Sequence, residues 1–306
     1  MSSPATMSAP TGQRSFLTAI TRPARALPPG ACDTHAHVFG PYERFALSAE
    51  RSYTPPPSPF EDYLRMLDTA GMTRGVLVHP SAYGFDPGAM LDALARAPRR
   101  LRGIAVADRL IDDETLADLD ARGVRGLRFT ETGGGGTRYT GAVGLTEFDA
   151  LAPRLRELGW HAVVWAPCAR LAIELPRLLG AGIPVVLDHM GMLEVARGVG
   201  GADFQALLAH LRGGALWLKL SLPRVSQRFP DYDDLRPFHD ALLHANPDRL
   251  LWGSDWPFLR LAESTPAVGQ LIDLFDAWTD DEELRRKVFV DNPAALYGFD
   301  GVKSAG

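Results

Sequence analysis

The sequence predicts an α/β protein built from a repeated unit of one strand and one helix. Short apolar runs of the kind found in buried parallel strands alternate with amphipathic stretches of helical length. Eight such runs can be recognised, the number that closes a TIM (β/α)8 barrel. A doubly wound open sheet is the alternative, but no Gly-x-Gly-x-x-Gly follows the first run. The predicted fold class is therefore a TIM barrel in a single domain.

The strands are expected where the apolar runs lie, with helices in the intervals. The expected strands cover residues 31–33, 75–79, 103–107, 124–129, 161–165, 183–188, 215–220 and 249–252. A helix is predicted over 60–70, and Gly71 ends it. Further helices are expected over 86–97, after the acidic residues 112–114, and before Gly159.

The chain is expected to consist of an N-terminal tail, residues 1–29, and a barrel domain, residues 30–306. A length of 306 residues suits one α/β barrel. The first 30 residues are rich in Ser, Thr, Ala, Pro and Arg and contain no acidic residue. The apolar run at 16–20 is too short for the core of a secretory signal, which favours a loose tail lying on the barrel.

Composition and charge argue against several classes of protein. The chain is 46% hydrophobic with a net charge of −5, a balance that suggests neither nucleic acid nor an anionic membrane as a partner. No apolar run approaches the roughly 20 residues of a membrane helix. Two cysteines, Cys32 and Cys168, are too few for a disulfide scaffold and favour a reducing compartment. We expect a cytoplasmic protein, as a monomer or a small homo-oligomer.

Four polar residues stand at the ends of predicted strands. His35 and His37 follow the first strand, His189 follows the sixth, and Asp255 follows the eighth. Alternation along a strand puts His35 and His37 on the same face. In a barrel of this type the C-terminal ends of the strands meet at one mouth, where active sites lie. The four side chains are therefore predicted to converge on one catalytic site.

Three imidazoles and a carboxylate form a donor set that suits one Zn²⁺ or a similar divalent ion. Such an ion would polarise a carbonyl and lower the pKa of bound water. On this hypothesis His35, His37, His189 and Asp255 are metal ligands, with Asp255 a ligand, a general base or both. The alternative is that each histidine is a hydrogen-bonded structural residue, since a motif alone is a hypothesis.

Longer motifs around these residues carry a resemblance to a known family. They occupy residues 33–41, 188–191, 252–257 and 291–297. Over roughly residues 28–299 the chain resembles the amidohydrolase superfamily, specifically its amidohydrolase-2 branch. Within that branch it is similar to the 2-pyrone-4,6-dicarboxylate lactonases and to neighbouring sugar-lactone and muconolactone hydrolases.

The resemblance implies that Asp255 activates water and that the histidines help to polarise a lactone carbonyl, without an obligatory metal. The chain departs from the superfamily at the end of the fifth strand. Many members carry a carboxylated lysine or a histidine there, and this chain has Trp165. The departure weakens the case for zinc and excludes a lysine-bridged binuclear centre of the usual form. Two alternatives for the cofactor therefore remain: one divalent metal ion, with zinc as the candidate, or no metal.

The resemblance also implies arginines that bind substrate carboxylates. Arg128 ends the fourth strand and Arg224 follows the seventh. A guanidinium pairs bidentately with a carboxylate, but a salt bridge with a neighbouring acidic residue is the alternative for each. Arg138 is the nearby candidate for a further arginine, across a loop of different length. A related lactone with one carboxylate, or one with another ring, therefore fits as well as a dicarboxylated pyrone.

Three more residues are candidates for substrate binding. Ser81 and Tyr53 match pocket residues of the lactonases, and His79 ends the second strand. The alternative for Tyr53 is a loop residue stacked on proline, and for His79 a hydrogen-bonded structural residue.

The sequence thus predicts a hydrolase that opens a small carboxylated lactone by attack of Asp255-activated water. A lactone isomerase or a metal-dependent decarboxylase on the same scaffold is the alternative enzyme. A barrel that binds a carboxylated ligand without turnover is the non-enzymatic alternative.

Overall fold

The computed structural model describes residues 19–131, 139–261 and 265–299. Eight parallel strands form one sheet in the order β1 to β8. A parallel bridge between Ala36 and Trp256 joins β1 to the segment after β8 and nearly closes the barrel. The strands are β1 (Cys32–Ala36), β2 (Arg74–Val78), β3 (Leu101–Ala105), β4 (Val124–Thr130), β5 (His161–Trp165), β6 (Val185–Leu187), β7 (Leu216–Leu220) and β8 (Leu250–Trp252). The predicted TIM barrel is confirmed.

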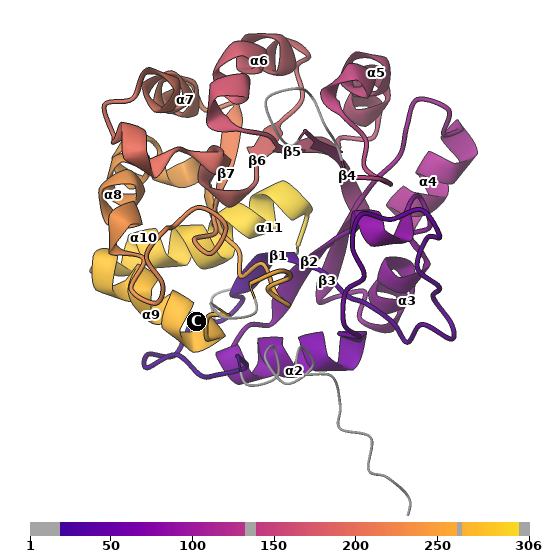
Figure 1. Ribbon diagram of the computed structural model, residues 1–306, viewed down its shortest axis with the longest axis horizontal. Coiled ribbons are helices and arrows are strands. Elements are labelled where there is room, and N and C mark those ends of the chain that lie inside the picture. Colours follow the sequence, from indigo (N-terminus) through magenta and orange to yellow (C-terminus); the bar gives the residue numbers. More distant parts are fainter. Residues whose placement is uncertain (1–18, 132–138, 262–264, 300–306) are drawn as a thin grey trace, which may run out of the picture.

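Most of the helices surround this ring of strands, and the last of them, Asn292–Tyr297, lies across the ring in the view of Figure 1. They are α2 (Phe60–Ala70), α3 (Gly88–Arg96), α4 (Asp113–Ala121), α5 (Phe148–Glu157), α6 (Cys168–Gly180), α7 (Ala202–Arg212), α8 (Arg236–Ala245), α9 (Val268–Trp278), α10 (Glu282–Arg286) and α11 (Asn292–Tyr297). The helix predicted over 60–70 is α2, and Gly71 ends it with a left-handed φ of 82°. The strand predicted over 103–107 lies two residues earlier, as β3.

The barrel interior is filled with apolar side chains on the side where the strands begin. Val76, Ile104, Val163 and Val186 from four strands cluster there with Tyr297 of α11. The interior is thus a packed core rather than a channel. The polar residues of the site follow these positions along the strands, so the site rests on a rigid apolar floor.

The described part of the predicted tail, residues 19–29, lies against α9 and α10. The amide of Val268 donates to the carbonyl oxygen of Ala19 (2.8 Å), and the amide of Ala24 donates to Asp273 (2.7 Å). Arg285 of α10 donates to the carbonyl oxygen of Ala26 at 2.9 Å. This segment is therefore fixed by specific bonds, while the domain boundary at residue 29 stays a prediction.

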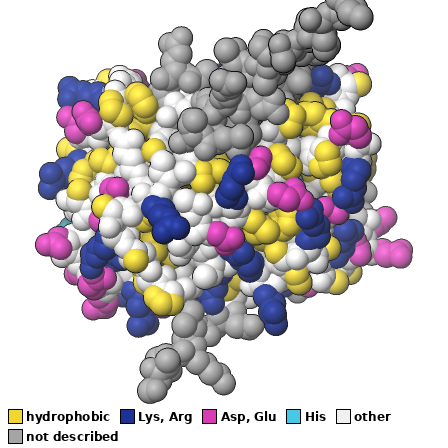
Figure 2. Space-filling view, turned by 90° about the horizontal axis from the view of Figure 1, so that it is seen from below, with side chains coloured by type: hydrophobic (Ala, Val, Ile, Leu, Met, Phe, Trp, Pro, Cys, Tyr) yellow, Lys and Arg dark blue, Asp and Glu magenta, His cyan; other side chains and the backbone are white. Residues whose placement is uncertain are grey.

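The outer surface carries interleaved charges. Figure 2 shows basic and acidic side chains side by side on one face, with hydrophobic side chains between them. Arg65 pairs with Asp62 within α2 (2.6 Å), and Arg96 at the end of α3 pairs with Glu61 of α2 (2.5 Å). Among the residues that the structure describes, none of the helices has the length and hydrophobicity of a membrane span.

His161, at the start of β5, provides a test of this interior packing. Its ring contacts that of Tyr297 (5.1 Å between centroids), and burial lowers its pKa to about 3. The unfolded chain, with a histidine pKa near 6.5, binds the proton more tightly, so stability falls as the pH drops from about 6.5 toward 3. We expect His161→Phe to flatten the pH dependence of the unfolding free energy between pH 6.5 and 4, measured by urea denaturation.

The exposed His244 supplies the control for this test, since it lies at the end of α8 on the surface. His244→Gln should keep the wild-type slope. Equal slopes for His161→Phe and wild type would contradict a neutral, buried His161.

Candidate active site

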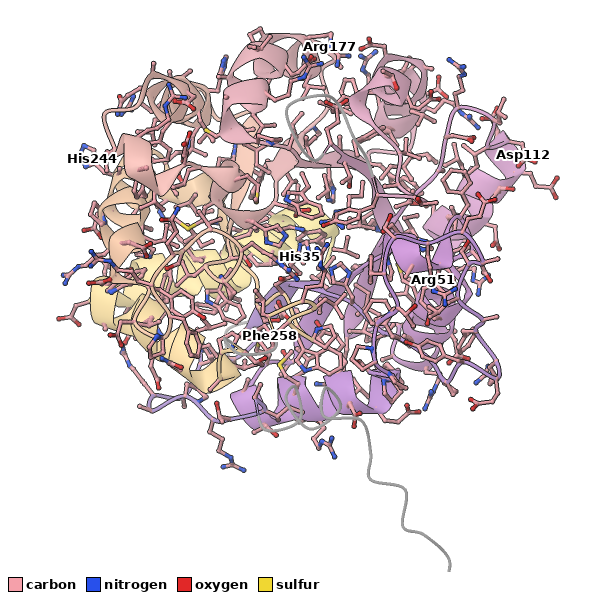
Figure 3. The ribbon with its side chains drawn as sticks, in the orientation of Figure 1. His35, Arg51, Asp112, Arg177, His244 and Phe258 are labelled. Atoms are coloured by element: carbon pink, nitrogen blue, oxygen red, sulfur yellow. The ribbon has the colours of Figure 1, made fainter. Side chains whose placement is uncertain are left out.

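A pocket opens where the strands end. Figure 3 shows His35 at the centre of the ring of strands, while Asp112, Arg177 and His244 lie at the outer edge of the molecule. The described residues that line the pocket are His37, Tyr53, His79, Ser81, Val106, Arg128, Thr130, Tyr139, Ala142, Trp165, His189, Arg224, Asp255, Leu259 and Arg260. Because they stand at or after the carboxyl ends of all eight strands, the pocket occupies the usual active-site position of this fold.

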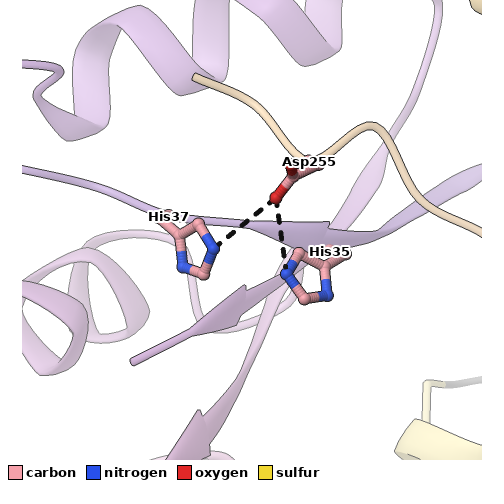
Figure 4. Close-up of side chains that lie close together, drawn as sticks. All are labelled: His35, His37 and Asp255. Carbon is pink, nitrogen blue, oxygen red and sulfur yellow. Dashed lines mark ion pairs between the residues drawn. The ribbon is translucent and has the colours of Figure 1, made fainter. Parts of the chain in front are cut away.

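Asp255 faces both histidines of the first strand. Its Oδ1 lies 3.7 Å from His35 Nε2 and 3.8 Å from His37 Nε2 (Figure 4). Backbone bonds hold this geometry, since Asp255 N donates to His35 O and His37 N donates to Trp256 O, both at 2.9 Å. The ring of His189 lies 4.7 Å from that of His35. The structure thus brings together the four residues that the sequence predicted to converge.

Two of these four residues have an unusual backbone. The φ angle is 65° at Asp255 and 48° at His189, in the left-handed region that side chains other than glycine rarely adopt. Such conformations cost of order 1–3 kcal/mol and persist where the surrounding structure fixes them. Backbone strain therefore coincides with the two site residues that follow β6 and β8.

A buried carboxylate, Asp33 of β1, fixes the segment that carries Asp255. Its Oδ1 accepts hydrogen bonds from the amides of Ser254 (2.9 Å) and His35 (3.1 Å). Its Oδ2 accepts from the Ser254 hydroxyl at 2.7 Å and from Tyr63 of α2 at 3.4 Å. Burial nevertheless raises the pKa of Asp33 to about 6. One carboxylate thus ties β1, α2 and the turn after β8 together.

A second buried carboxylate, Asp188, follows β6. Its Oδ1 lies 3.0 Å from Lys219 Nζ and 3.1 Å from His35 Nδ1, and its Oδ2 accepts from Arg128 Nε at 3.0 Å. Burial alone would raise the pKa of Asp188, but Lys219, His35 and Arg128 outweigh it and hold the pKa well below its usual range. Asp188 is therefore an anion that links β4, β6 and β7.

The histidines of the site are neutral. Burial lowers the pKa of His35 and lowers the pKa of His37 and His189 well below the usual value. His37 Nδ1 lies 2.7 Å from the carbonyl oxygen of Val78, which can only accept, so Nδ1 carries the proton. The lone pair on His37 Nε2 therefore faces Asp255. His189 Nδ1 lies 3.3 Å from the hydroxyl of Ser221, which can donate or accept.

His35, His37 and Asp255 could hold a metal ion. Each offers one donor atom, and these atoms lie within 4.8 Å of one another. Among the described residues His35 Nε2 has no hydrogen-bond partner, which suits a nitrogen that meets a ligand. Two imidazoles and a carboxylate fit one catalytic divalent ion. The indole of Trp165, at the end of β5, has no lone pair with which to bind a metal. His189 belongs to a second group of possible ligands, together with His35 and Asp188.

The two arginines predicted to bind substrate line the pocket and also pair with acidic residues of the protein. Arg128 contacts Asp188 Oδ2 through Nε and a terminal nitrogen, both at 3.0 Å. Arg224 Nε donates to Asp255 Oδ2 at 2.5 Å. The salt bridges considered as the alternative are thus present. Each guanidinium has five N–H donors, so substrate binding by the same residues stays a prediction.

Three of the four other residues predicted to bind substrate line the pocket. Ser81, Tyr53 and His79 line the pocket, and Tyr53 is hydrogen-bonded to the Ser81 side chain. His79 Nε2 lies 2.8 Å from the Gly84 carbonyl oxygen, so it carries a proton, and burial lowers the His79 pKa to about 4. Arg138 lies outside the described residues.

Sequence reasoning missed Lys219, Tyr139 and Arg260. Lys219 stands in β7 and is fully buried, and a lysine inside an apolar run was the available signal. Tyr139 stacks on Trp165 (5.5 Å between centroids, 23° between planes), and Arg260 donates to the Tyr139 hydroxyl at 3.0 Å. Tyr139 and Arg260 stand on loops after different strands, and no pattern in the sequence pairs such loops.

Residues 32–299 match the family model described as amidohydrolase. The chain belongs to this family. A 4-sulfomuconolactone hydrolase from Rhizobium radiobacter is 41% identical over 277 residues, which is 89% of this chain and 91% of that protein. A D-galactarolactone isomerase from Agrobacterium fabrum is 29% identical over 289 residues, or 93% and 96% of the two chains.

A solved structure from Acinetobacter baumannii is similar along its whole length. It is a probable 2-pyrone-4,6-dicarboxylic acid hydrolase with citric acid bound, 28% identical, with a TM-score of 0.77 over 88% of this chain and 100% of that chain. The family resemblance drawn from the motifs is confirmed. Of these three proteins, one is named a hydrolase and one a probable hydrolase, in agreement with the predicted enzyme class.

The Ser254 hydroxyl can be tested as the support of the Asp255 turn. It donates to Asp33 and accepts from the amide of Trp256 at 3.0 Å. Ser254→Ala removes both bonds and leaves a buried carboxylate one donor short, which should lower the unfolding free energy by about 1–3 kcal/mol in urea denaturation. Ser48→Ala, which removes an exposed hydroxyl, should change it by less than about 0.5 kcal/mol. Equal stabilities of the two variants would argue against this support.

Proposed function

We propose that this protein is a hydrolase that opens a small lactone bearing a carboxylate or a comparable anionic group. The observation that carries the proposal is the Asp255 carboxylate, which faces two neutral imidazoles in an arginine-lined pocket. The relative from Rhizobium radiobacter is by its name a lactone hydrolase, which supports the same class of reaction.

Asp255 is suited to be the general base. Its Oδ1 faces the histidines while Arg224 holds Oδ2. In the proposed reaction Oδ1 takes a proton from water, and the resulting hydroxide attacks the ring carbonyl carbon. The ring C–O bond then breaks and Asp255 returns the proton to the leaving oxygen. One lactone and one water thereby give one hydroxy acid.

The histidines have different tasks in this scheme. His37 carries its proton on Nδ1, so its Nε2 accepts and can orient the attacking water rather than stabilise an oxyanion. The donors for the oxyanion must come from elsewhere, and two candidates are the ring of His35, 5.0 Å from that of His37, and the ring of His189, 4.7 Å from that of His35. This division refines the sequence-based hypothesis that all three histidines polarise the carbonyl.

The charge of the pocket favours an anionic substrate. Arg128, Arg224 and Arg260 line it, and Asp255 is the only carboxylate among its described lining residues. The stacked rings of Trp165 and Tyr139 form a flat wall that suits a planar ring. The similar Acinetobacter baumannii protein has citric acid, a carboxylate compound, bound in its structure, which supports the same kind of ligand for this chain.

A divalent metal ion, with zinc as the candidate, is compatible with the same residues. His35, His37 and Asp255 would hold it, and when bound it would polarise the carbonyl and lower the pKa of water. We further propose a cytoplasmic enzyme, monomeric or a small homo-oligomer, with neither nucleic acid nor membrane as partner. Both cysteines are free and buried, which suits a reducing compartment.

A panel of lactone acids, followed with a pH indicator and by NMR of the products, tests the reaction class. Hydrolysis releases one proton per ring opened. Isomerisation, the activity named for the Agrobacterium fabrum relative, conserves the lactone and releases none. Decarboxylation releases CO₂, and binding without turnover leaves the substrate unchanged. Any of these three outcomes in place of ring opening would reject the proposal.

Asp255→Asn tests the general base. The amide cannot take a proton from water, so kcat on the best lactone of the panel should fall by about 10²–10⁴-fold. The urea unfolding midpoint should stay close to that of the wild type, because the side chain keeps its shape. Near-native turnover by this variant would rule out Asp255 as the base.

Arg260→Gln tests the anionic substrate. The variant removes one positive charge from the pocket, so KM for an anionic lactone should rise about tenfold with little change in kcat. Its matched control is Arg122→Gln, an exposed arginine at the end of α4. An unchanged KM for Arg260→Gln, or an equal rise in the control, would contradict a role for Arg260 in recognition.

A further inference from the structure

Lys219 is a buried cation for which the proposed reaction has no use. It is fully buried in β7, and it is one of three lysines among the 32 basic residues of the chain. Its Nζ lies 3.0 Å from Asp188 Oδ1 and 3.2 Å from His35 Nδ1. A buried ammonium costs free energy unless acceptors surround it, so its contact with His35 requires an explanation.

Two groups compete for the same nitrogen of His35. Lys219 Nζ, which can only donate, and Asp188 Oδ1, which can only accept, both approach Nδ1, at 3.2 and 3.1 Å. A neutral imidazole has one protonated nitrogen, so Nδ1 can satisfy one of the two groups. The choice sets the other end of the ring, because Nε2 is the nitrogen that faces Asp255 in Figure 4.

The two tautomers of His35 differ in how many unfavourable contacts they make, that is, contacts of donor with donor or of acceptor with acceptor. With the proton on Nδ1, an N–H faces the ammonium of Lys219, and the bare Nε2 faces the carboxylate of Asp255 at 3.7 Å. With the proton on Nε2, Nδ1 accepts from Lys219, and the N–H points toward Asp255. The remaining conflict is then a lone pair beside Asp188 Oδ1, an oxygen that Lys219 already bonds. The second tautomer has fewer opposed contacts and gives the buried ammonium two acceptors.

We propose that Lys219 is a positioning residue that holds His35 as its Nε2–H tautomer. His35 then donates into the site while His37, fixed by Val78, accepts. The two rings flank Asp255 as a donor and an acceptor, one for the oxyanion and one for the water. A metal at His35 Nε2 would require the proton to move to Nδ1, against Lys219. Lys219 therefore biases this site toward metal-independent chemistry.

This inference deepens the proposed function at the same site, but its test needs no substrate. The probe is ¹⁵N NMR of the histidine rings in full-length, chelator-treated protein, with His35 assigned by its loss in His35→Asn. In the wild type we expect an unprotonated Nδ1 and a protonated Nε2. In Lys219→Met the pattern should reverse, since Nδ1–H can then donate to Asp188. In Lys219→Gln, whose amide can donate, it should return at least in part.

Zinc affinity gives a second readout, measured by competition with a chromophoric chelator. Lys219→Met should bind zinc about tenfold more tightly than the wild type, because a carboxylate partner on Nδ1 strengthens an imidazole ligand. Lys287→Met, which alters an exposed lysine paired with Asp248, is the control and should match the wild type in both measurements.

A protonated Nδ1 in the wild type would overturn the inference even if Lys219→Met failed to fold. Unchanged tautomers or unchanged zinc affinity in a folded Lys219→Met would overturn it as well. A wrong substrate class would leave all of these results unaltered, so the inference and the proposed function fail separately.

Discussion

The geometry of the site depends on the bonds that the buried Asp33 carboxylate receives. Its partners come from β1 itself, from α2 and from the turn after β8. They hold the turn in the conformation that gives Asp255 its left-handed backbone. Without these bonds between β1 and the turn after β8, nothing in this network would hold the histidines of β1 next to an aspartate more than 200 residues later.

Charge pairing determines what the site can do. Asp188 is surrounded by Lys219, Arg128 and His35, and Asp255 is held by Arg224. Buried ions are tolerated when each has partners of opposite charge, and such pairs also fix orientation. The carboxylate that faces the pocket is thus preorganised, and a substrate meets charges that need no rearrangement.

The sequence was sufficient for the strands and for the four converging residues, because both follow from periodicity and from the geometry of parallel strand ends. It was not sufficient for contacts between strands. That Arg128 pairs with Asp188, and Arg224 with Asp255, depends on which side chains meet across the barrel. Lys219 was missed for the same reason, since its apolar strand predicts burial but not a partner. Tyr139 and Arg260 meet through loops whose paths no pattern encodes.

Whether the histidines of this site can bind a metal depends on which ring nitrogen carries the proton, and not only on how many histidines there are. A His-x-His pair with a distant aspartate reads as a metal site when each imidazole offers a lone pair. Here His37 offers one at Nε2, because its Nδ1 keeps the proton and donates it in a hydrogen bond to the Val78 carbonyl oxygen. His35 faces a buried ammonium that favours the opposite tautomer. Two neighbouring histidines therefore differ through groups outside the motif. A metal-ligand motif has to be considered together with the tautomers of its histidines. One lysine beside a histidine can determine whether that ring offers a lone pair to a metal or an N–H to a hydrogen-bond acceptor.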